Sequence, residues 1–351
     1  MSRPDLSRAL LSLGLAPRPA IASYARDQQV LAWSDQGVVL AGFARSRGLK
    51  LEDWLADAQV KAGGSLSPAE LLRLLKPLLA LSADAPFVLG QLWWPGHFGL
   101  ASQALQQAEH SLEAAERLAR YAGRLCPLLC PRAMVQGGQM WLVFTEAIGL
   151  PAAQRAALID LHLSAFASLC QWRSGDHLPW RFHFNRTAPR DLSQHLVLMG
   201  PALQFDCQVD ALSLPLTTAL RPWPRDSGRS AQLAVAALDE GADAQALRCG
   251  WLAGVSDRLL NQLSGDGASL EALARELAVS SATLKRQFSA HGSHYQAELD
   301  KLRSLLALAL MRLQAWSPEA VGQALGFVDT SNFRKSFRRW TGLSPRAWIQ
   351  A

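Results

Sequence analysis

Two short stretches near the end of the chain gather side chains that can contact nucleic acid. The first contains Ser281, Ala282, Lys285 and Arg286, and the second contains Thr330, Ser331, Asn332, Arg334, Lys335, Arg338 and Arg339. Hydroxyl, amide and basic groups reach base edges in a groove of the duplex, whereas the methyl of Ala282 can contact only an apolar group such as that of thymine. We expect Arg338 and Arg339 to contact phosphates, which position a protein without specifying sequence, and Arg334 to be able to do either.

A helical pattern that occurs twice places both stretches at equivalent positions. Glu271 and Glu319 open the two copies 48 residues apart, and Phe288 and Phe337 close them 49 apart, so the second turn is one residue longer. Each copy has one small residue where two helices must approach closely and another at the turn: Ala274 and Ala278 in the first, Gly322 and Gly326 in the second. This is the layout of a helix-turn-helix, whose second helix lies in a DNA major groove. We predict such units at 269–291 and 317–340.

A long helix is predicted between the two units, because apolar residues recur at helical spacing from His294 to Leu313. About twenty helical residues span roughly 30 Å, and one turn of B-DNA is about 34 Å. Two recognition helices on such a helix can therefore enter successive major grooves. The residues expected to anchor them to the domain are Leu284, Phe288, Phe333 and Phe337.

The second copy resembles the signature of the AraC/XylS family of bacterial transcription regulators. Ala324–Phe327, Asp329–Phe333 and Phe337–Pro345 carry this resemblance, which ends near Trp348. Ser280–Phe288 is similar to the first motif of the same family. The resemblance covers roughly the last hundred residues. It implies an all-helical DNA-binding domain. Its base-contacting positions would be Ser281, Ala282, Lys285 and Arg286 in the first unit and Thr330, Ser331, Asn332 and Lys335 in the second.

An earlier part of the chain more loosely resembles the sensor domain that is named after arabinose binding in one branch of these regulators. Gly90, Pro95–Gly99 and Ser111–Tyr121 carry this resemblance. The name describes a domain family and does not establish that the ligand here is a sugar.

The composition is that of a globular protein, with 49% hydrophobic and 18% charged residues. The formal net charge is +6, and residues 269–351 contain eleven Lys and Arg against six Asp and Glu. A basic end on a nearly neutral remainder suggests that this end binds nucleic acid. Neither a signal peptide nor an apolar run long enough to span a membrane is visible. We therefore expect a bacterial cytoplasmic protein that is associated with the nucleoid when bound to DNA.

The cysteines fit buried thiols in a reducing compartment, since they are odd in number and scattered: Cys126, Cys130, Cys170, Cys207 and Cys249. Cys126 and Cys130 are one helical turn apart, but prolines interrupt their segment and no His is close. We therefore expect no metal site and no cofactor. Catalytic residues are not predicted either, because neither a nucleophile elbow nor a Gly-rich oxyanion loop is present.

Residues 1–222 are predicted to form an α+β sensor domain of helices and a small antiparallel sheet. Helices are expected at 49–61, 67–81, 111–125 and 151–173, and strands at 133–136, 139–145, 180–184 and 205–209. A polar segment with prolines suggests a linker at 223–244. Residues 245–351 would then form an all-α DNA-binding domain, with two helix-turn-helix units joined by a long helix.

Tryptophans are frequent in the N-terminal part, and four are candidates for the wall of a ligand pocket: Trp93, Trp94, Trp141 and Trp180. Aromatic walls suit a small apolar or amphipathic molecule. The alternative, which is favoured for any single Trp, is an ordinary core residue.

These observations favour a sequence-specific DNA-binding transcription regulator, an activator or a repressor, that responds to a small-molecule effector. The expected partners are double-stranded operator or promoter DNA, RNA polymerase, the effector and, in a homodimer, a second copy of the chain; no membrane partner is expected. Two alternatives are an architectural DNA-binding protein without a ligand and an enzyme domain fused to a DNA-binding tail. The large aromatic N-terminal domain argues against the first. The second resembles DNA alkyl-transfer repair proteins, but their reactive Cys and four-Cys zinc spacing are missing here.

Overall fold

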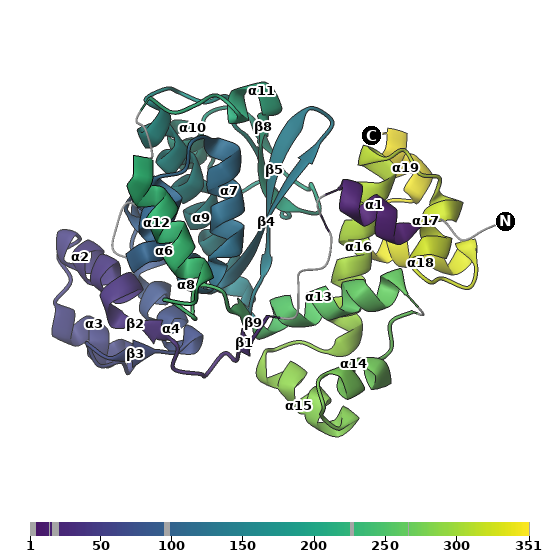
Figure 1. The fold of residues 1–351 in the computed structure, drawn as a ribbon, viewed down its shortest axis with the longest axis horizontal. Helices are drawn as coiled ribbons and strands as arrows, with labels where there is room; N and C mark the ends of the chain where they lie inside the picture. The colour runs from purple at the N-terminus through teal and green to yellow at the C-terminus, as the bar shows by residue number, and fades with distance from the viewer. Residues whose placement is uncertain are drawn as a thin grey trace. The chain divides into compact units, whose positions relative to one another are not determined.

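A computed structural model of the chain describes residues 5–13, 15, 21–94, 99–224, 228–265 and 267–350 (Figure 1). Contacts separate the described residues into two units. The larger unit contains residues of 21–133 and 138–251, and the helical unit contains residues of 1–20, 134–137 and 252–351. Pro95–Phe98, part of the predicted sensor motif, lie outside the described residues.

A five-stranded sheet in the order β4-β5-β8-β6-β7 forms one layer of the larger unit. Its strands are β4 (Leu129–Gln136), β5 (Gln139–Glu146), β6 (Arg181–His183), β7 (Leu203–Gln204) and β8 (Asp210–Pro215). β8 runs antiparallel to both β5 and β6, whereas β6 and β7 are parallel. The predicted α+β class with a small, mostly antiparallel sheet is therefore confirmed. The strand predicted at 205–209 is wrong, because Asp206 and Gln208 adopt left-handed φ angles of 57° and 61°, which interrupt an extended chain.

Helix α9 (Ala152–Ser174) contacts β8 and also packs against α5 (Ala85–Trp93). The two helices touch closely at Gly90, where an added Cβ would lie 2.3 Å from Oγ of Ser164. Figure 1 shows α6, α7, α9 and α12 gathered on one side of the sheet. The core of the larger unit therefore lies between this helical layer and the sheet.

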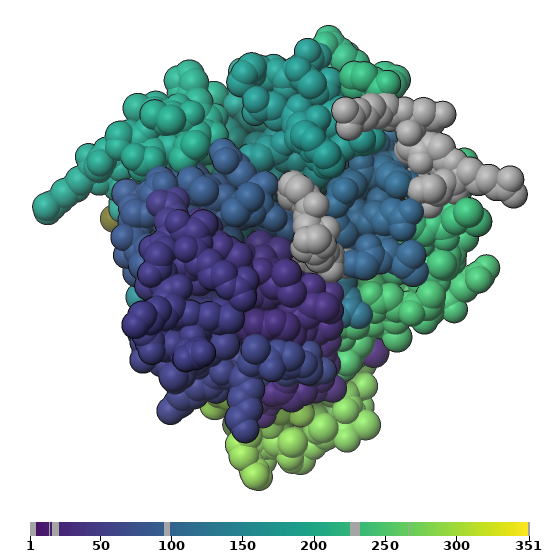
Figure 2. All heavy atoms as spheres, turned by 90° about the vertical axis from the view of Figure 1, so that its left-hand side faces the viewer, coloured from purple at the N-terminus to yellow at the C-terminus, as the bar shows by residue number. Residues whose placement is uncertain are grey.

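The larger unit has further helices, several of which begin without a side-chain cap. They are α2 (Val38–Ser46), α3 (Leu51–Ala58), α4 (Pro68–Leu79), α6 (Gly99–Gln106), α7 (Ser111–Arg120), α8 (Ala122–Leu125), α10 (Ser193–Met199), α11 (Leu216–Ala219) and α12 (Gly228–Asp239), with the π-helix η1 (Trp33–Gly37) before α2. α4 begins with a capping box, in which Oγ of Ser67 accepts a hydrogen bond from N–H of Glu70 at 3.2 Å and Oε2 of Glu70 accepts from N–H of Ser67 at 2.8 Å. On the face shown in Figure 2, α2 to α4 (purple) form a continuous surface.

Two short strand pairs complete the larger unit. β2 (Leu31–Ala32) pairs with β3 (Ser65–Leu66) in antiparallel orientation. β1 (Ser23–Tyr24) pairs in parallel with β9 (Cys249–Gly250), so residues from both ends of this unit meet in one small sheet.

Contacts divide the chain differently from the boundaries expected at 222 and 245. Segment 223–244 contains α12, which packs against α6, and the larger unit continues to Trp251. At the other end, α1 (Leu6–Ser12) belongs to the helical unit, where Leu6, Ala9 and Leu10 are buried. Both differences arise from apolar packing between segments that are distant in sequence. The composition of a single segment does not indicate such packing.

The C-terminal part of the helical unit contains α13 (Trp251–Ser264), α14 (Leu270–Glu276), α15 (Ser281–Ala290), α16 (Tyr295–Leu313), α17 (Pro318–Ala324), α18 (Thr330–Thr341) and α19 (Pro345–Gln350). α13 begins at Trp251, directly after β9, and so carries the chain from one unit into the other. None of the described helices has the length and apolar character needed to cross a membrane.

Candidate nucleic-acid interface

Two helical pairs, α14–α15 and α17–α18, repeat the same hydrogen bonds at the start of their first helix. Oγ of Ser269 accepts from N–H of Ala272 at 3.0 Å, and Oγ of Ser317 accepts from N–H of Ala320 at 3.2 Å. Both contacts are N-caps, which satisfy a backbone donor that the helix leaves free. The repeat seen in the sequence is therefore also a structural repeat.

The turn inside each pair is built in the same way. N–H of Val279 donates to the carbonyl of Ala274, and N–H of Phe327 donates to that of Gly322, both at 3.0 Å. Ala278 and Gly326, one residue earlier in each turn, have φ angles of 53° and 79°. The small residue expected at each turn therefore occupies a left-handed backbone position.

The additional residue of the second turn lies directly before the N-cap of α18. The second helices are capped by equivalent residues, Oγ of Ser280 accepting from N–H of Thr283 at 3.1 Å and Oδ1 of Asp329 accepting from N–H of Asn332 at 2.7 Å. Val328, which precedes the second cap, is 98% exposed. The longer turn therefore places an apolar side chain on the surface without changing how α18 begins.

The inward side of each second helix is buried as predicted. Leu284 and Phe288 of α15 and Phe333 and Phe337 of α18 are at most 1% exposed. Phe333 lies so close to the first helix of its pair that a Cβ on Gly322 would be 3.0 Å from its own Cβ. The small residue expected at this helix crossing is needed for packing.

The opposite side of each second helix carries the predicted DNA-contacting residues. Ser281 and Thr330 are half-buried, and the others, Ala282, Lys285, Arg286, Ser331, Asn332, Arg334, Lys335, Arg338 and Arg339, are exposed. Within the described ranges, Lys285, Arg286, Lys335 and Arg338 make no ion pair. These four cations are therefore available to an anionic partner.

Two arginines of α18 have acidic partners inside the helical unit. Nη2 of Arg334 lies 2.7 Å from Oε1 of Glu319, and Nη2 of Arg339 lies 2.7 Å from Oδ2 of Asp300. A backbone hydrogen bond at its own helix start lowers the pKa of Glu319, and the bond from Arg334 lowers it further. Both arginines are mostly exposed, and surface pairs of this kind contribute little stability, so a phosphate can replace the acid.

The structural repeat continues beyond the two pairs, which the sequence analysis missed. Gly292 and Gly342 follow α15 and α18 with left-handed φ angles of 65° and 78°. Nδ1 of His294 and Oγ of Ser344 then cap the next helix, accepting from N–H of Ala297 and Ala347 at 3.1 and 3.2 Å. The visible signal was the pair of glycines 50 residues apart.

A cleft of about 500 Å³ lies beside the second pair. Residues of α17, α18 and α19 and of the turn before α19 line it: Pro318, Glu319, Arg334, Ser344, Pro345, Arg346 and Ile349. Its wall thus contains the Arg334–Glu319 ion pair.

In the larger unit, the four candidate tryptophans fall into two places. Trp93, Trp94 and Trp180 are at most 7% exposed and belong to the core beside α9. Trp141 is half-buried on β5, and its ring lies 4.8 Å from that of His183. The structure therefore does not bring all four together.

A buried histidine lies among these aromatic rings. His162 of α9 is 1% exposed, with its ring about 6 Å from those of Trp93, Trp94 and Phe144. Nδ1–H donates to the carbonyl of Leu158 at 2.7 Å, while Nε2 has no hydrogen-bond partner among the described residues. Burial lowers its pKa to about 4, so Nε2 is an unprotonated acceptor in an apolar environment.

Comparison with known proteins identifies the class of molecule to which these units belong. A family model described as the arabinose-binding domain of AraC transcription regulators, N-terminal, matches residues 48–223, half of the chain. A second model, described as a helix-turn-helix domain, matches residues 273–351. The chain belongs to the AraC family of transcription regulators. The predicted family, with its arabinose-binding-type sensor domain, is therefore confirmed.

Relatives of this AraC family member are named as regulators. The ornithine utilization regulator of Pseudomonas aeruginosa is 29% identical over 62% of this chain and 64% of its own length. An uncharacterized HTH-type transcriptional regulator of Mycobacterium bovis is 24% identical over 88% of this chain and 93% of its own length. The solved structure of the regulator CdpR from Pseudomonas aeruginosa is 21% identical and aligns over 88% of this chain and 98% of that chain, with a TM-score of 0.41.

These findings confirm the prediction of a DNA-binding transcription regulator with an N-terminal ligand-binding domain at the level of the family. They indicate a regulatory and not a catalytic role. No group of three or more His, Cys, Asp or Glu able to hold a metal is found in the part of the chain that the structure describes.

Proposed function

We propose that the two helical pairs act as two helix-turn-helix units, which place α15 and α18 in successive major grooves of an operator. The observation that carries this proposal is the structural repeat, in which caps, turns and buried anchors are equivalent. Each second helix consequently presents its polar side to solvent. One chain would then read a site that most helix-turn-helix proteins cover as dimers.

The length of α16 fits this arrangement. Its 19 residues correspond to about 28 Å of helix, close to the roughly 34 Å of one turn of B-DNA. The guanidinium of Arg303 of α16 stacks on the Phe327 ring at 4.8 Å, so α16 contacts the turn of the second pair. This contact would keep α18 at a fixed angle to α16.

The roles of the exposed residues follow from their position along the helices. Residues of the first turns would contact bases: Ser281, Ala282, Lys285 and Arg286 in α15, and Thr330, Ser331, Asn332 and Lys335 in α18. Arg338 and Arg339, which lie later in α18, would contact phosphates, and Arg334 can serve either role.

We further propose that the larger unit binds a small apolar or amphipathic effector. The aromatic environment of Trp93 and Trp94, with His162 Nε2 as an unpartnered acceptor, supports an effector that combines apolar surface with one hydrogen-bond donor. Thermal melting across a panel of metabolites tests this, because a bound effector raises the melting temperature. Ornithine belongs in the panel because one relative is named for its utilization.

Mapping of bound DNA across a genome, followed by footprinting of the purified protein, tests the DNA-binding proposal. We expect two protected major-groove segments one helical turn apart within each site. Protection of a single groove per chain would contradict the two-unit reading. Light scattering of the protein–DNA complex measures homodimerisation. Transcription assays with purified RNA polymerase show whether the polymerase responds to the bound protein.

A further inference from the structure

The last residues of the larger unit, Asp243–Gly250, lead directly to α13 and are called the exit segment here. Gly123 of α8 touches this segment, since a Cβ there would lie 2.2 Å from the carbonyl oxygen of Gln245. Gly250 touches the residue that follows β5, since a Cβ there would lie 2.2 Å from the carbonyl oxygen of Ala147. Only glycine fits at such approaches. The exit segment is therefore held closely against α8 and β5.

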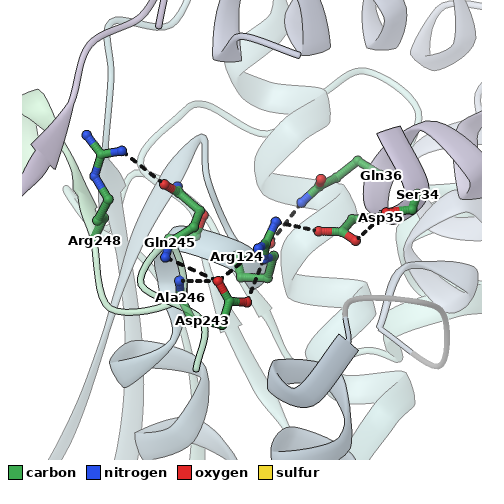
Figure 3. Close-up of polar contacts among 9 residues, drawn as sticks. Ser34, Asp35, Gln36, Arg124, Asp243, Gln245, Ala246 and Arg248 are labelled. Carbon is green, nitrogen blue, oxygen red and sulfur yellow. Dashed lines mark hydrogen bonds and ion pairs between the residues drawn. The ribbon is translucent and has the colours of Figure 1, made fainter. Parts of the chain in front are cut away.

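Arg124, the neighbour of Gly123, holds the same segment through charge. Its Nε and Nη2 atoms donate to the two carboxylate oxygens of Asp243, both at 2.8 Å. Nη1 donates to Oδ2 of Asp35 at 2.9 Å. Figure 3 shows the Arg124 guanidinium between these two acids. One positive charge is thus shared by a carboxylate of the exit segment and a carboxylate of η1.

The backbone around Arg124 is bonded to the interior of the larger unit. Nε2 of Gln36, a fully buried residue of η1, donates to the carbonyl of Arg124 at 2.8 Å. Nε1 of Trp94 donates to the carbonyl of Leu125 at 2.9 Å. Trp94 is one of the rings around His162. The backbone of Arg124 and Leu125 is therefore hydrogen-bonded both to η1 and to the aromatic cluster around His162.

The two acids are not equally well satisfied. Burial raises the pKa of Asp35 above its ordinary value, and the charge of Arg124 only partly offsets this. Burial lowers the pKa of Arg124, but its hydrogen bonds to Asp243 and the charge of Asp35 raise it overall. The contacts differ as well, because Asp243 receives two nitrogen atoms of the guanidinium and Asp35 receives one.

We propose that Arg124 is a positioning residue for regulation, in which Asp35 and Asp243 compete for one guanidinium and so set how firmly the exit segment is held. This rests on the proposed function, since a more loosely or more firmly held exit segment would change operator binding by the helical unit. π-Helical segments such as η1 occur frequently at functional sites, which agrees with a role for Asp35 beyond folding.

Competition predicts opposite effects of two equally small substitutions. Asp243→Asn removes the charge, while the new amide oxygen can still accept from N–H of Gln245 and Ala246 as Oδ1 of Asp243 does. It should loosen the exit segment. Asp35→Asn leaves the whole positive charge to Asp243 and should tighten it. A merely structural ion network would be loosened by both.

Hydrogen exchange of the full-length protein measures this. The reporting amides are those of Ala246, Arg248 and Cys249, which donate to the carbonyls of Asp243, Gln245 and Ala22. We expect exchange about tenfold faster in Asp243→Asn and about threefold slower in Asp35→Asn. The matched control is Arg120→Gln, which breaks the exposed Arg120–Asp239 pair between the neighbouring helices α7 and α12 and should leave these amides unchanged.

Operator affinity of the same variants completes the test. We expect Asp243→Asn and Asp35→Asn to shift the dissociation constant at least threefold and in opposite directions, while Arg120→Gln stays within twofold of the parent. Arg124→Lys keeps the charge but loses the fork, so its exchange should resemble that of Asp243→Asn.

A common direction of exchange in both Asn variants overturns the competition, and altered exchange with unchanged operator affinity overturns the regulatory role. Failure of the proposed function looks different, because the unsubstituted protein itself would then bind no operator while the exchange differences persisted. If Arg124→Lys does not fold, the two Asn variants still decide.

Discussion

Nη2 of Arg303 lies 3.6 Å from the place that a Cβ on Gly326 would occupy. This is an ordinary van der Waals distance, so the space beside the second turn admits a methyl group. The constraint at Gly326 is therefore its backbone, whose φ of 79° suits glycine and few other residues. Ala278, at 53° in the first turn, shows that alanine is tolerated at the equivalent position.

Gly326→Val should impair the second unit specifically. A β-branched side chain at positive φ forces the turn to change, which misaligns Thr330–Lys335 relative to α16. Footprinting should show protection retained over one major groove and lost over the next, with the overall fold kept. Gly326→Ala is the matched control and should cost only about 1–2 kcal/mol of stability. Protection of both grooves by the valine variant would show that the turn does not orient α18.

Arg286→Ala should weaken specific binding by about 1–3 kcal/mol and relax the base preference at one or two operator positions. The reason is that the exposed arginine of α15 can donate two hydrogen bonds to the edge of one guanine. Binding to a set of single-base operator variants measures this. Arg338→Ala is the control for a phosphate contact and should weaken binding to all sequences alike. An unchanged base preference in Arg286→Ala would show that Arg286, like Arg338, contacts the DNA phosphates and not a base.

The DNA-binding half was readable from sequence because its determinants are local. Capping hydroxyls, small residues at turns and anchors at helical spacing all act within a few residues of one another. The strands expected at 133–136 and 139–145 were readable for the same reason, because Gly137 and Gly138 mark the turn between them and adopt left-handed φ angles of 58° and 71°.

The features that sequence reasoning missed depend on distant contacts. β1 and β9 are two residues each, and Ser23 pairs with Cys249, so neither strand has a pattern of its own. Arg124 meets acids that are 89 and 119 positions away. α12 lies in the segment that was expected to be a linker because prolines stand at its start. The packing of α12 against α6, which is distant in sequence, makes it part of the larger unit. His162 gave no sign of an unpartnered nitrogen, since burial is set by the whole fold.

A fragment of residues 245–351 should be helical and bind the operator, because both helical pairs and α16 lie within it. The structure adds that it should be several kcal/mol less stable than the complete helical unit, since burying each large apolar side chain contributes about 1.5–3 kcal/mol. The missing residues include Leu6, Leu10 and Leu13 of the α1 region, which are buried, and Ala9, whose carbonyl accepts from Nε2 of Gln314 at 3.3 Å.

A peptide of residues 5–15 should therefore raise the melting temperature of this fragment, and the same peptide with Leu10→Asp should not. Melting followed by circular dichroism checks both. No response to either peptide would mean that α1 contributes little to the helical unit. A fragment that is folded but inert on the operator would instead indicate that dimerisation through the larger unit supplies most of the affinity.

The larger unit should lose stability in mild acid because of His162 and His183. Burial lowers the pKa of each to about 4, against an ordinary value of about 6.5 in the unfolded chain. Between these values the unfolded state binds more protons than the folded state, so stability is complete above pH 6.5 and falls as the pH decreases towards 4. Each histidine should contribute a loss of roughly 2 kcal/mol between pH 7 and pH 5. Urea unfolding of the parent and of His162→Gln at both pH values checks this, since a neutral amide removes one of the two contributions. An identical pH dependence in the variant would show that His162 is not held neutral by its surroundings.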